Sequence, residues 1–508
     1  LQAVTFDGKP VGSPVQSAVE PGKETEPVEM VVDMGEEAGL WSEHTPNAYK
    51  MNVSVQSSGG TDEACYDFGL REFKANGTRF EVNGQPVFLR GTLECCIFPL
   101  TGYPAMQPDY WAKIYRTCKE YGLNHVRFHS WCPPEAAFHV ADSMGIYLQV
   151  ECGAWAEVGS GKPQDQWLKE ESDRILKAYG NHPSFCMMVY GNEPAGADQV
   201  AYLSGLVDYW KSKDSRHVYS SAAGWPYVGN ADYWNAPNPR IQAWGAGLRS
   251  IINREAPRTD YDFAGIIRQD MPTVSHEIGQ WCVYPNFKEI EKYTGVLKAK
   301  NFEIFQETLK EHHMADLADD FLFASGRLQT LCYKADIEGA LRTPGFAGFQ
   351  LLDLHDFPGQ GTALVGVLDP FWEEKGYVTP EEYSTFCNKT VPLVRFPKMV
   401  WLNNETLNVP LEVAHFGEKP LQAANITWEI SNQAGEKIAQ GNFVKDLSVT
   451  NCIPAGNIEY PFSGIEKPTQ LVVSAEVKET GSKNQWNIWV YPAKQETVDK
   501  QPYITSAL

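Results

Sequence analysis

The sequence predicts a multidomain protein with a central (β/α)8 TIM barrel, flanked by N-terminal and C-terminal immunoglobulin-like β-sandwich domains. Three observations support this fold class. The chain has 508 residues, more than one ordinary hydrophobic core holds. In its middle, apolar strand-like runs alternate with amphipathic helical patterns, as in a parallel sheet covered by helices. At both ends, short runs alternate apolar and polar residues between turn residues, which is typical of antiparallel sheets.

These patterns divide the chain into three domains. We expect a partial immunoglobulin-like sandwich over residues 1–75, the (β/α)8 barrel over 76–396 and a C-terminal sandwich over 397–508. The N-terminal domain is expected to contain strands in "EMVVDM" (29–34) and "AYKMNVSVQ" (48–56). A hairpin around Asn83-Gly84, within residues 79–91, then leads into the barrel.

The barrel region offers about eight strand positions over roughly 290 residues, the size of a (β/α)8 barrel. The predicted helices are 109–122, 134–145, 165–180, 198–214 and 318–342. Beyond the hairpin, the predicted strands are 125–131, 146–151, 185–193, 217–224, 240–247, 272–279 and 345–357. A doubly wound open sheet is the alternative, although no Gly-rich phosphate loop follows an early strand. The C-terminal strands are expected within 405–417, 425–443, 469–477 and 485–492.

Composition excludes several classes of partner. The net charge of −21 leaves no basic surplus to neutralise phosphates, so a nucleic-acid partner is not expected. The same charge argues against an anionic membrane surface, and no run of 18 apolar residues predicts membrane insertion. A neutral or weakly charged substrate fits this composition better.

Cysteine usage and the first residues add two expectations. The 11 Cys show no metal-ligand spacing, and the vicinal pair Cys95–Cys96 is their only cluster, so a full disulfide framework is not expected. The chain opens "LQAVTFDGKP" without an initiator Met, so we expect a processed or truncated product.

Two glutamates stand at the ends of predicted barrel strands. Glu193 follows Asn192 in "MMVYGNEP", and Glu277 follows His276 in "PTVSHEIG". Carboxyl ends of barrel strands converge on one face, so these side chains are expected to meet there. Paired carboxylates suit glycosidic cleavage, in which one protonates the leaving oxygen and the other attacks the anomeric carbon. The alternative is that each glutamate is an ion-paired strand end; Arg127 is available to keep one of them ionised.

Other catalytic motifs fit less well. "HEIGQ" begins like the zinc motif H-E-x-x-H, but Gln280 occupies the second ligand position and the segment reads as a strand. We therefore expect no metal and no organic cofactor. No G-x-S-x-G nucleophile elbow is present either.

Four segments resemble the catalytic barrel of glycoside hydrolase family 2, which includes β-galactosidases, β-glucuronidases and β-mannosidases. They are "FEVNGQPVFLRG", "NHVRFHSWCPPEAAFHVADSMGIYLQVE", "MMVYGNEP" and "SHEIGQW". The resemblance implies that Glu193 is the general acid/base, that Glu277 is the nucleophile and that Asn192 contacts the sugar 2-hydroxyl. Further substrate-binding candidates are Arg127, His129, Glu151, Glu94, Trp131, Trp155, Trp225, Trp244, His276 and Trp281.

The sequence also departs from the family pattern. Glu94 lies in "GTLECC", where the family carries Asn and His, and His129 comes one place early after Arg127. The last strand, "GFQLLDLHDF", lacks the Trp commonly found there. From the resemblance we expect an N-terminal sugar-binding jelly roll that this sequence lacks, and a missing N-terminal domain of the same precursor is therefore an expected candidate partner.

The leading expectation is a retaining exo-β-glycosidase with a carbohydrate substrate, first a β-galactoside. An α-L-arabinopyranosidase, a β-glucuronidase and a β-mannosidase of the same fold are alternatives, as is endo action at an open cleft. A β-glucuronidase would need an Asn/Lys pair, for which Asn286 and Lys288 are weak candidates. The rival of another class is a non-catalytic glycan-binding protein. A periplasmic or secreted location is expected from the resemblance, and the oligomeric state is left open.

Overall fold

The computed structural model describes residues 1–19, 28–242 and 246–493. Its centre is an eight-stranded parallel sheet in the order β12-β11-β10-β9-β8-β15-β14-β13. The strands are β8 (Leu89–Glu94), β9 (His125–Phe128), β10 (Tyr147–Glu151), β11 (Phe185–Val189), β12 (Val218–Tyr219), β13 (Trp234–Ala236), β14 (Thr273–Gly279) and β15 (Phe346–Leu352). Ala223, beyond β12, forms a parallel bridge to Asn235 of β13, so the sheet curls until its two edge strands meet. This confirms a TIM-like parallel sheet at the centre of the chain.

Helices follow most of these strands, and the predicted long helices are confirmed. The longer helices are α1 (Pro108–Glu120), α2 (Glu135–Met144), α3 (Pro163–Tyr179), α4 (Gln199–Lys213), α6 (Lys300–Glu311) and α7 (Ala318–Leu341). Shorter turns are η1 (Gly247–Arg249), α5 (Ile251–Arg254), η2 (Ala264–Ile266), η3 (Phe287–Lys292), η4 (Ala315–Leu317), η5 (Pro358–Gln360) and α8 (Pro380–Tyr383). Gly145 ends α2 in a left-handed conformation, as a C-terminal Gly does. No helix among the described residues is long and apolar enough to cross a membrane.

The strand predicted at 240–247 is wrong for residues 240–242 and 246–247, which are in no strand, and residues 243–245 lie outside the described part of the chain. The sixth barrel strand is β13, six residues earlier, and it ends at Ala236 before Pro237. The chain then turns toward α7, where the Ile241 amide donates to Asp336 at 2.7 Å. Proline cannot donate to a sheet ladder, so a strand at this place stays short.

The N-terminal region forms one antiparallel sheet in the order β2-β1-β3-β4. Its strands are β1 (Gln2–Thr5), β2 (Pro10–Val11), β3 (Ala48–Ser57) and β4 (Gly60–Gly69). The strand expected at 29–34 is wrong: these residues are not in a strand, and Val31 is 82% exposed. Within the described residues no second sheet covers this one, so the partial sandwich is a single layer there.

A small hairpin closes the amino-terminal end of the barrel. It consists of β5 (Phe73–Asn76), β6 (Arg79–Val82) and β7 (Gln85–Val87). Asn83 and Gly84 both have positive φ, as a two-residue hairpin turn requires, and the predicted turn is confirmed. The Phe80 ring packs 5.6 Å from Tyr233, just before β13. Because these strands cover the amino-terminal end of the barrel, a ligand could enter only at the opposite, carboxyl end.

The C-terminal region is a sandwich of two antiparallel layers with its own core. One sheet contains β16 (Thr390–Val394), β18 (Thr406–His415) and β21 (Thr450–Pro461). The other contains β17 (Val400–Leu402), β23 (Ser482–Tyr491), β22 (Thr469–Val477), β19 (Leu421–Asn432) and β20 (Lys437–Leu447), and only β17 joins it in parallel. The predicted terminal β-domain is confirmed, and since β16 belongs to it, the sandwich begins by residue 390.

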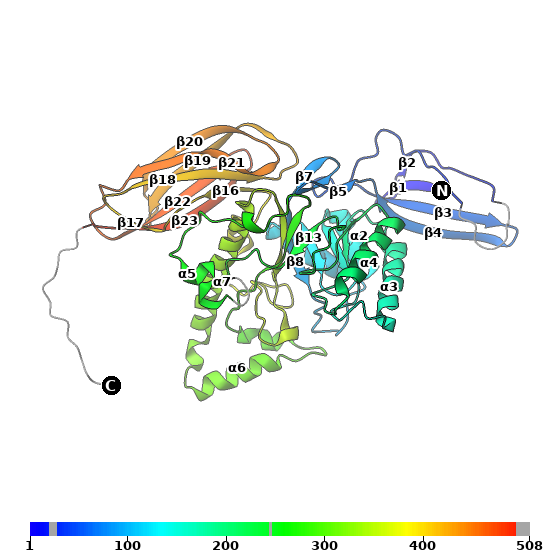
Figure 1. Ribbon diagram of the computed structural model, residues 1–508, viewed down its shortest axis with the longest axis horizontal. Helices are drawn as coiled ribbons and strands as arrows, with labels where there is room; N and C mark the ends of the chain where they lie inside the picture. Colours follow the sequence, from blue (N-terminus) through cyan, green and yellow to red (C-terminus); the bar gives the residue numbers. More distant parts are fainter. Residues whose placement is uncertain (20–27, 243–245, 494–508) are drawn as a thin grey trace.

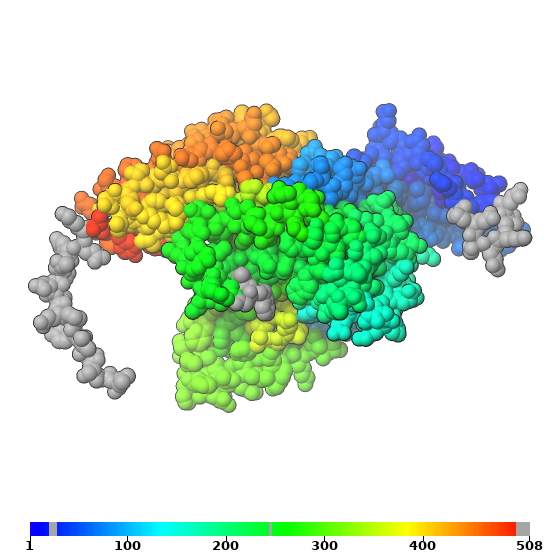
Figure 2. Space-filling view, viewed as in Figure 1, coloured from blue at the N-terminus to red at the C-terminus, as the bar shows by residue number. Residues whose placement is uncertain are grey.

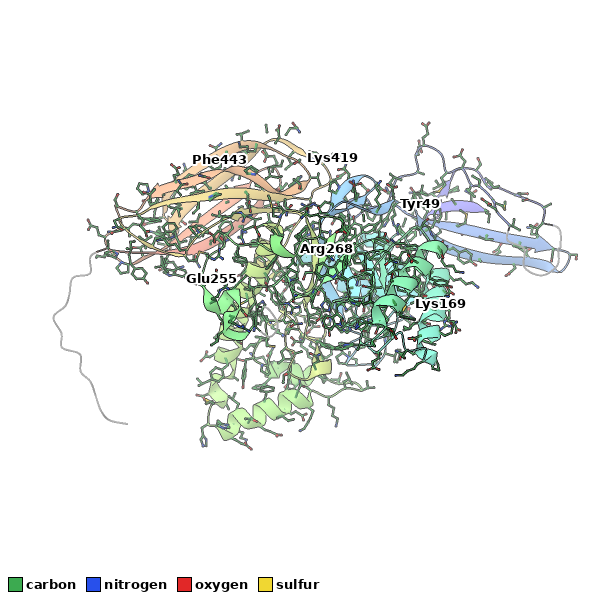
Figure 3. The ribbon with its side chains drawn as sticks, in the orientation of Figure 1. Tyr49, Lys169, Glu255, Arg268, Lys419 and Phe443 are labelled. Carbon is green, nitrogen blue, oxygen red and sulfur yellow. The ribbon has the colours of Figure 1, made fainter. Side chains whose placement is uncertain are left out.

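The flanking sheets lie at opposite ends of one side of the barrel. Figure 1 shows the C-terminal sheets and the N-terminal sheet on either side of the central strands, with α6 on the far side. Figure 2 shows the same three parts as adjoining surfaces, orange and blue to either side of green. In Figure 3, Tyr49 and Phe443 mark the two flanking regions, and Arg268 marks the barrel between them.

Candidate active site

The two predicted catalytic glutamates lie together at the carboxyl end of the barrel. Glu193 follows β11, and Glu277 lies near the end of β14. Between Ser275 and Ile278 the register of β14 against β15 shifts by one residue, which is a β-bulge at His276–Glu277. Bulges re-aim side chains near functional sites. This one turns Glu277 toward its neighbours at the mouth.

Backbone strain is concentrated at the same place. Glu193 and Glu277 have φ of 38° and 51°, in the left-handed region that non-glycine residues rarely adopt. Ser130, after β9, and Gln280, after β14, share this conformation with φ of 60° and 65°. Such strain costs about 1–3 kcal/mol per residue and is found mainly at active sites and ligand clamps. The mouth of the barrel is therefore a candidate active site on backbone geometry alone.

Glu277 is held by four polar side chains. Its Oε1 lies 3.1 Å from His276 Nε2, 3.3 Å from Arg127 Nη1 and 3.6 Å from His129 Nε2. Its Oε2 accepts a hydrogen bond from Gln280 at 3.2 Å. Burial alone would raise the pKa of Glu277, but the hydrogen bond from His276 and the charge of Arg127 hold that pKa well below its ordinary value. Glu277 is thus ionised at neutral pH.

Glu193 has the opposite electrostatics. Burial raises its pKa to about 7, and the nearby Glu277 carboxylate adds to the rise. Its side chain remains 25% exposed at the rim, whereas that of Glu277 is 8% exposed. The ligand oxygens of the two carboxylates lie within 4.8 Å of each other. One group therefore carries a proton near neutral pH while its neighbour carries a charge.

Arg127 connects three groups beneath this pair. Its guanidinium donates to Glu151 Oε1 at 2.6 Å, to Asn192 Oδ1 at 2.7 Å and to Glu277 at 3.3 Å. Glu151 also accepts from the Ser130 amide at 2.6 Å, which fixes the turn after β9. Glu151 and Arg127 are fully buried and position Asn192 and Glu277, and a substrate contact of either stays a prediction.

Two polar atoms beside the pair have no partner among the described residues. Asn192 Nδ2 and His276 Nδ1 are buried without a hydrogen bond. Burial lowers the pKa of His276, so the imidazole is neutral near pH 7. Its Nε2 faces Asn192 Oδ1 at 3.0 Å and carries the proton, which leaves Nδ1 as an acceptor. Buried orphans of this kind are uncommon in native structures. A donor and an acceptor are thus left free at the mouth.

Two further predicted contact residues, Glu94 and Trp131, make structural contacts within the chain. The Glu94 carboxylate is 1% exposed and accepts from the amides of Cys96 and Ile97 at 3.1 and 3.3 Å. Glu94 thus caps this turn, and burial raises its pKa to about 8. A sugar contact of Glu94 stays a prediction. The Trp131 ring packs 5.4 Å from Phe128, and its indole donates to the Glu94 carbonyl. A sugar contact of Trp131 stays a prediction.

The remaining tryptophans differ in exposure. Trp155 is 51% exposed and lies edge-on to His129 at 5.3 Å, and Trp225 is 40% exposed with its indole on the Pro194 carbonyl at 3.0 Å. Both belong to segments that border the Glu193 loop, through the bridges Glu157–Ala195 and Asn192–Ala223. Trp281 is partly buried, and its indole donates to Asp336 at 2.8 Å. Trp244 lies outside the described residues.

The Asn286/Lys288 pair does not form an anion site. The Asn286 side chain accepts from the Lys288 amide, and Lys288 Nζ pairs with Asp319 at 3.1 Å on the surface. The end of β15, where the family Trp is absent, is occupied by Asp353. This buried carboxyl accepts from Thr92 Oγ1 at 2.6 Å. The pocket floor is therefore built differently on this side.

Three residues of the site escaped prediction as functional. Gln280 was noted only as a failed zinc ligand, and Arg240 lay inside a wrongly placed strand. Gly224 lies against the pair: a Cβ there would lie 3.3 Å from His276 Cε1 and 3.4 Å from Glu193 Cγ. In the sequence, the one available signal for Gly224 was that a Gly recurs at the end of several predicted strands.

The site also has the spacing of a metal site. Glu193, His276 and Glu277 offer ligand atoms that lie within 4.8 Å of one another. Arg127 already supplies positive charge 3.3 Å from Glu277 Oε1, which disfavours a cation there. The absence of a metal stays a prediction.

Comparison with known proteins supports the fold. A family profile described as "Domain of unknown function (DUF8488)" matches residues 405–492, within the C-terminal sandwich. A β-glucuronidase of Parabacteroides merdae is 14% identical with a TM-score of 0.56, over 97% of this chain and 59% of that one. A β-glucuronidase of Bacteroides uniformis is 15% identical with a TM-score of 0.56, over 97% of this chain and 57% of that one. A β-D-mannosidase of Dictyoglomus thermophilum is 14% identical with a TM-score of 0.64, over 96% and 62%.

The chain therefore spans about three fifths of the length of the β-glucuronidase structures that it matches. At this level of identity the likeness concerns the fold, and nearly all of this chain takes part in it. The protein has the multidomain fold of structurally known β-glycosidases, with a TIM-like parallel sheet between flanking antiparallel sheets.

Proposed function

We propose that this protein is a retaining exo-β-glycosidase of glycoside hydrolase family 2, built on a (β/α)8 barrel with immunoglobulin-like flanking domains. One observation carries the proposal: the carboxylates of Glu193 and Glu277 lie within 4.8 Å of each other with pKa values displaced in opposite directions. Retaining glycosidases hold their two carboxyl groups about 5–5.5 Å apart, and inverting enzymes about 6.5–9.5 Å apart. The short separation favours retention.

The two glutamates would divide the chemistry. Glu277, ionised and held by Arg127 and His276, attacks the anomeric carbon and forms a glycosyl–enzyme ester. Glu193, protonated near pH 7 and exposed at the rim, gives its proton to the departing oxygen. It then takes a proton from the water that hydrolyses the ester. This sequence of steps needs no metal or organic cofactor.

The free polar atoms suit the sugar. Asn192 Nδ2 would donate to the 2-hydroxyl of the glycone, because Arg127 fixes its Oδ1 and leaves the amide nitrogen free. His276 Nδ1 would accept from a second hydroxyl. The leaving group would pass the exposed rings of Trp155 and Trp225, which border the Glu193 loop on its two sides. We propose a β-galactoside as the first sugar to test, with the arabino, glucurono and manno alternatives beside it.

The rival is a non-catalytic glycan-binding protein. It would also use exposed tryptophans and free hydrogen-bonding atoms. It would have no use for one protonated and one ionised carboxylate held on strained backbone within 4.8 Å. The close pairing of two carboxylates in opposite protonation states on strained backbone therefore favours catalysis.

Hydrolysis of a panel of aryl glycosides by the wild type and by Glu277→Gln tests the proposal. We expect one sugar to be turned over and its rate to fall at least about 10³-fold in the variant, because the amide cannot act as the nucleophile. Retained binding of that sugar by Glu277→Gln, measured by calorimetry, controls for folding. Survival of most activity would refute the assignment of Glu277. An activated 2-fluoro glycoside should label the wild type at Glu277, and binding without labelling would favour the glycan-binding protein.

A further inference from the structure

Arg240 is a buried cation beside the catalytic pair with part of its hydrogen-bonding capacity unused. It is 5% exposed, in the loop after β13. Its Nη2 donates to the Pro237 carbonyl at 2.8 Å and approaches the His276 carbonyl at 3.5 Å. Its Nε and Nη1 are buried and have no hydrogen-bond partner. The backbone thus holds the guanidinium in place while two nitrogens, with three N–H groups, stay free.

Arg240 differs from every comparable cation of the described residues. Five Arg and Lys residues there are at most 5% exposed: Arg90, Arg127, Arg240, Arg342 and Lys375. Four of them have a close carboxylate: Arg90 has Glu43 at 3.2 Å, Arg127 has Glu151 at 2.6 Å, Lys375 has Asp356 at 2.6 Å, and Arg342 has Glu338. No carboxylate of the described residues lies within 4.0 Å of Arg240. Arg342 also keeps two unbonded nitrogens, but its charge is matched.

The acids nearest to Arg240 do not replace the missing partner. Burial lowers the pKa of Arg240, and the charges of Glu277, Asp336 and Glu193 oppose this from longer range. The contact of its Nη2 with the His276 carbonyl places Arg240 near the reacting groups. Asp336 uses its two oxygens on the Ile241 amide and the Trp281 indole, at 2.7 and 2.8 Å. Burying a cation without a counter-ion is costly, and a neutral hydroxyl would satisfy a donor without matching the charge. An anion from outside the chain would do both.

We propose that Arg240 binds an anionic substituent of the glycone, a carboxylate or a sulfate ester, and so selects acidic sugars as substrates. The proposal rests on the proposed glycosidase function and names its substrate class. It reverses the expectation of a neutral substrate drawn from net charge, because the charge that decides recognition is local. It also replaces Asn286 and Lys288, which are engaged elsewhere, as the anion-binding group.

A series of aryl glycosides of one ring stereochemistry tests the proposal. The β-D-galactoside, the α-L-arabinopyranoside, the β-D-galacturonide and the 6-sulfated β-D-galactoside differ only at the group on C5. The corresponding gluco and manno compounds extend the series to other rings. We expect an acidic member to exceed its neutral counterpart at least tenfold in kcat/KM. Comparing carboxylate with sulfate identifies the anion.

Variants of Arg240 supply the decisive comparison. Arg240→Gln should shrink the acidic-to-neutral ratio of kcat/KM about 10- to 100-fold, since hydrogen bonds to charged groups are the strong ones. Arg240→Lys should keep part of the ratio. Arg249→Gln, an equal charge change at an exposed position of the next turn, should leave the ratio as it is. Melting temperatures check folding, and removal of an unpaired buried charge should not lower that of Arg240→Gln.

Binding separates failure of this proposal from failure of the glycosidase function. Calorimetry with free D-galacturonate, D-glucuronate and galactose 6-sulfate, against D-galactose and D-glucose, needs no turnover. Acid-selective binding that Arg240→Gln abolishes would sustain the proposal even if no glycoside is hydrolysed. Turnover or binding of neutral sugars at least as good as that of acidic ones, lowered alike by Arg240→Gln, would overturn it while leaving glycosidase activity intact. Absence of all acid-selective binding and turnover would overturn it as well.

Discussion

Two buried glutamates of this protein look alike electrostatically and differ in almost everything else. Glu277 lies at the mouth of the barrel, and Glu338 lies where α7 meets the C-terminal sheets. Burial would raise the pKa of Glu338, but Lys334 and Arg342 outweigh it and lower that pKa to about 2. At Glu277, the hydrogen bond from His276 and the charge of Arg127 likewise lower the pKa against the effect of burial. A displaced pKa therefore marks both sites and does not tell which of them acts on a substrate.

Backbone and hydrogen bonding separate the two sites. Glu338 sits in the regular helix α7, where Lys334, Asn484 and Trp486 contact its oxygens at 2.7, 2.8 and 3.1 Å. Glu277 sits on a bulge with a φ of 51°. Beside Glu277, the groups Asn192 Nδ2 and His276 Nδ1 have no partner within the described part of the chain. Strain and unused hydrogen-bonding atoms, taken together, distinguish a site that awaits a ligand from one that joins two domains.

The largest effect should come from removing the proton donor. Glu193→Ala should lower turnover of glycosides with poor leaving groups about 10²–10⁴-fold and that of well-activated aryl glycosides far less, because only the former need protonation. In the wild type, kcat/KM should fall as the pH rises through about 7, where Glu193 loses its proton. That basic limb should vanish in the variant.

Rates across leaving groups and pH provide the measurement. Glu157→Ala, on the neighbouring loop with an exposed carboxylate, is the matched control and should change neither profile. Equal losses for good and poor leaving groups would contradict an acid role for Glu193. A basic limb that persists in Glu193→Ala would assign the proton to another group.

Substitution of Glu338, where α7 meets the C-terminal sheets, should lower stability and leave activity nearly unchanged. Glu338→Gln leaves the buried cations Lys334 and Arg342 without their carboxylate, which should cost about 3 kcal/mol of unfolding free energy. Glu303→Gln removes an exposed helical pair with Lys300 and should cost at most about 0.5 kcal/mol. Urea unfolding measures both, and kcat at a temperature where each variant is folded should stay near wild type. A large loss of kcat with unchanged stability would break the distinction between the two sites.

Much of the fold was readable from the sequence because its signals are local. Alternating strand and helix patterns, the Asn83-Gly84 turn and Gly145 after α2 each act within a few residues. The short strand β13 was misplaced because three residues before a proline carry little periodicity. The strand expected at 29–34 has a largely apolar composition, but among the described residues it pairs with no strand.

The site was readable in outline and not in its details. The pairing of Glu193 and Glu277 followed from their strand ends, but their separation depends on a bulge that no motif announces. Glu94 and Glu151 also end strands, yet one caps a turn and the other orients Arg127. The sequence does not distinguish a carboxylate at a strand end that faces the pocket from one that bonds to other groups of the protein. Arg240 stands out only against the ion pairs of other buried cations, which are contacts between distant segments.

The smallest of the predicted effects should come from substituting Gly224, beside the catalytic pair. Its φ is +96°, and a Cβ would press on His276 and Glu193 at 3.3 and 3.4 Å. Gly224→Ala should therefore cost about 1–2 kcal/mol in backbone strain. It should also displace the proton donor by a few tenths of an ångström, which should lower kcat about tenfold.

Gly229→Ala, where a Cβ meets nothing within 4 Å, should change neither property. Since Gly224 carries no chemical group, a fall in kcat larger than the change in stability would mean that the spacing of Glu193 and His276 is itself required. Equal behaviour of the two alanine variants would show that the mouth tolerates displacement, and it would weaken strain as a marker of the active site.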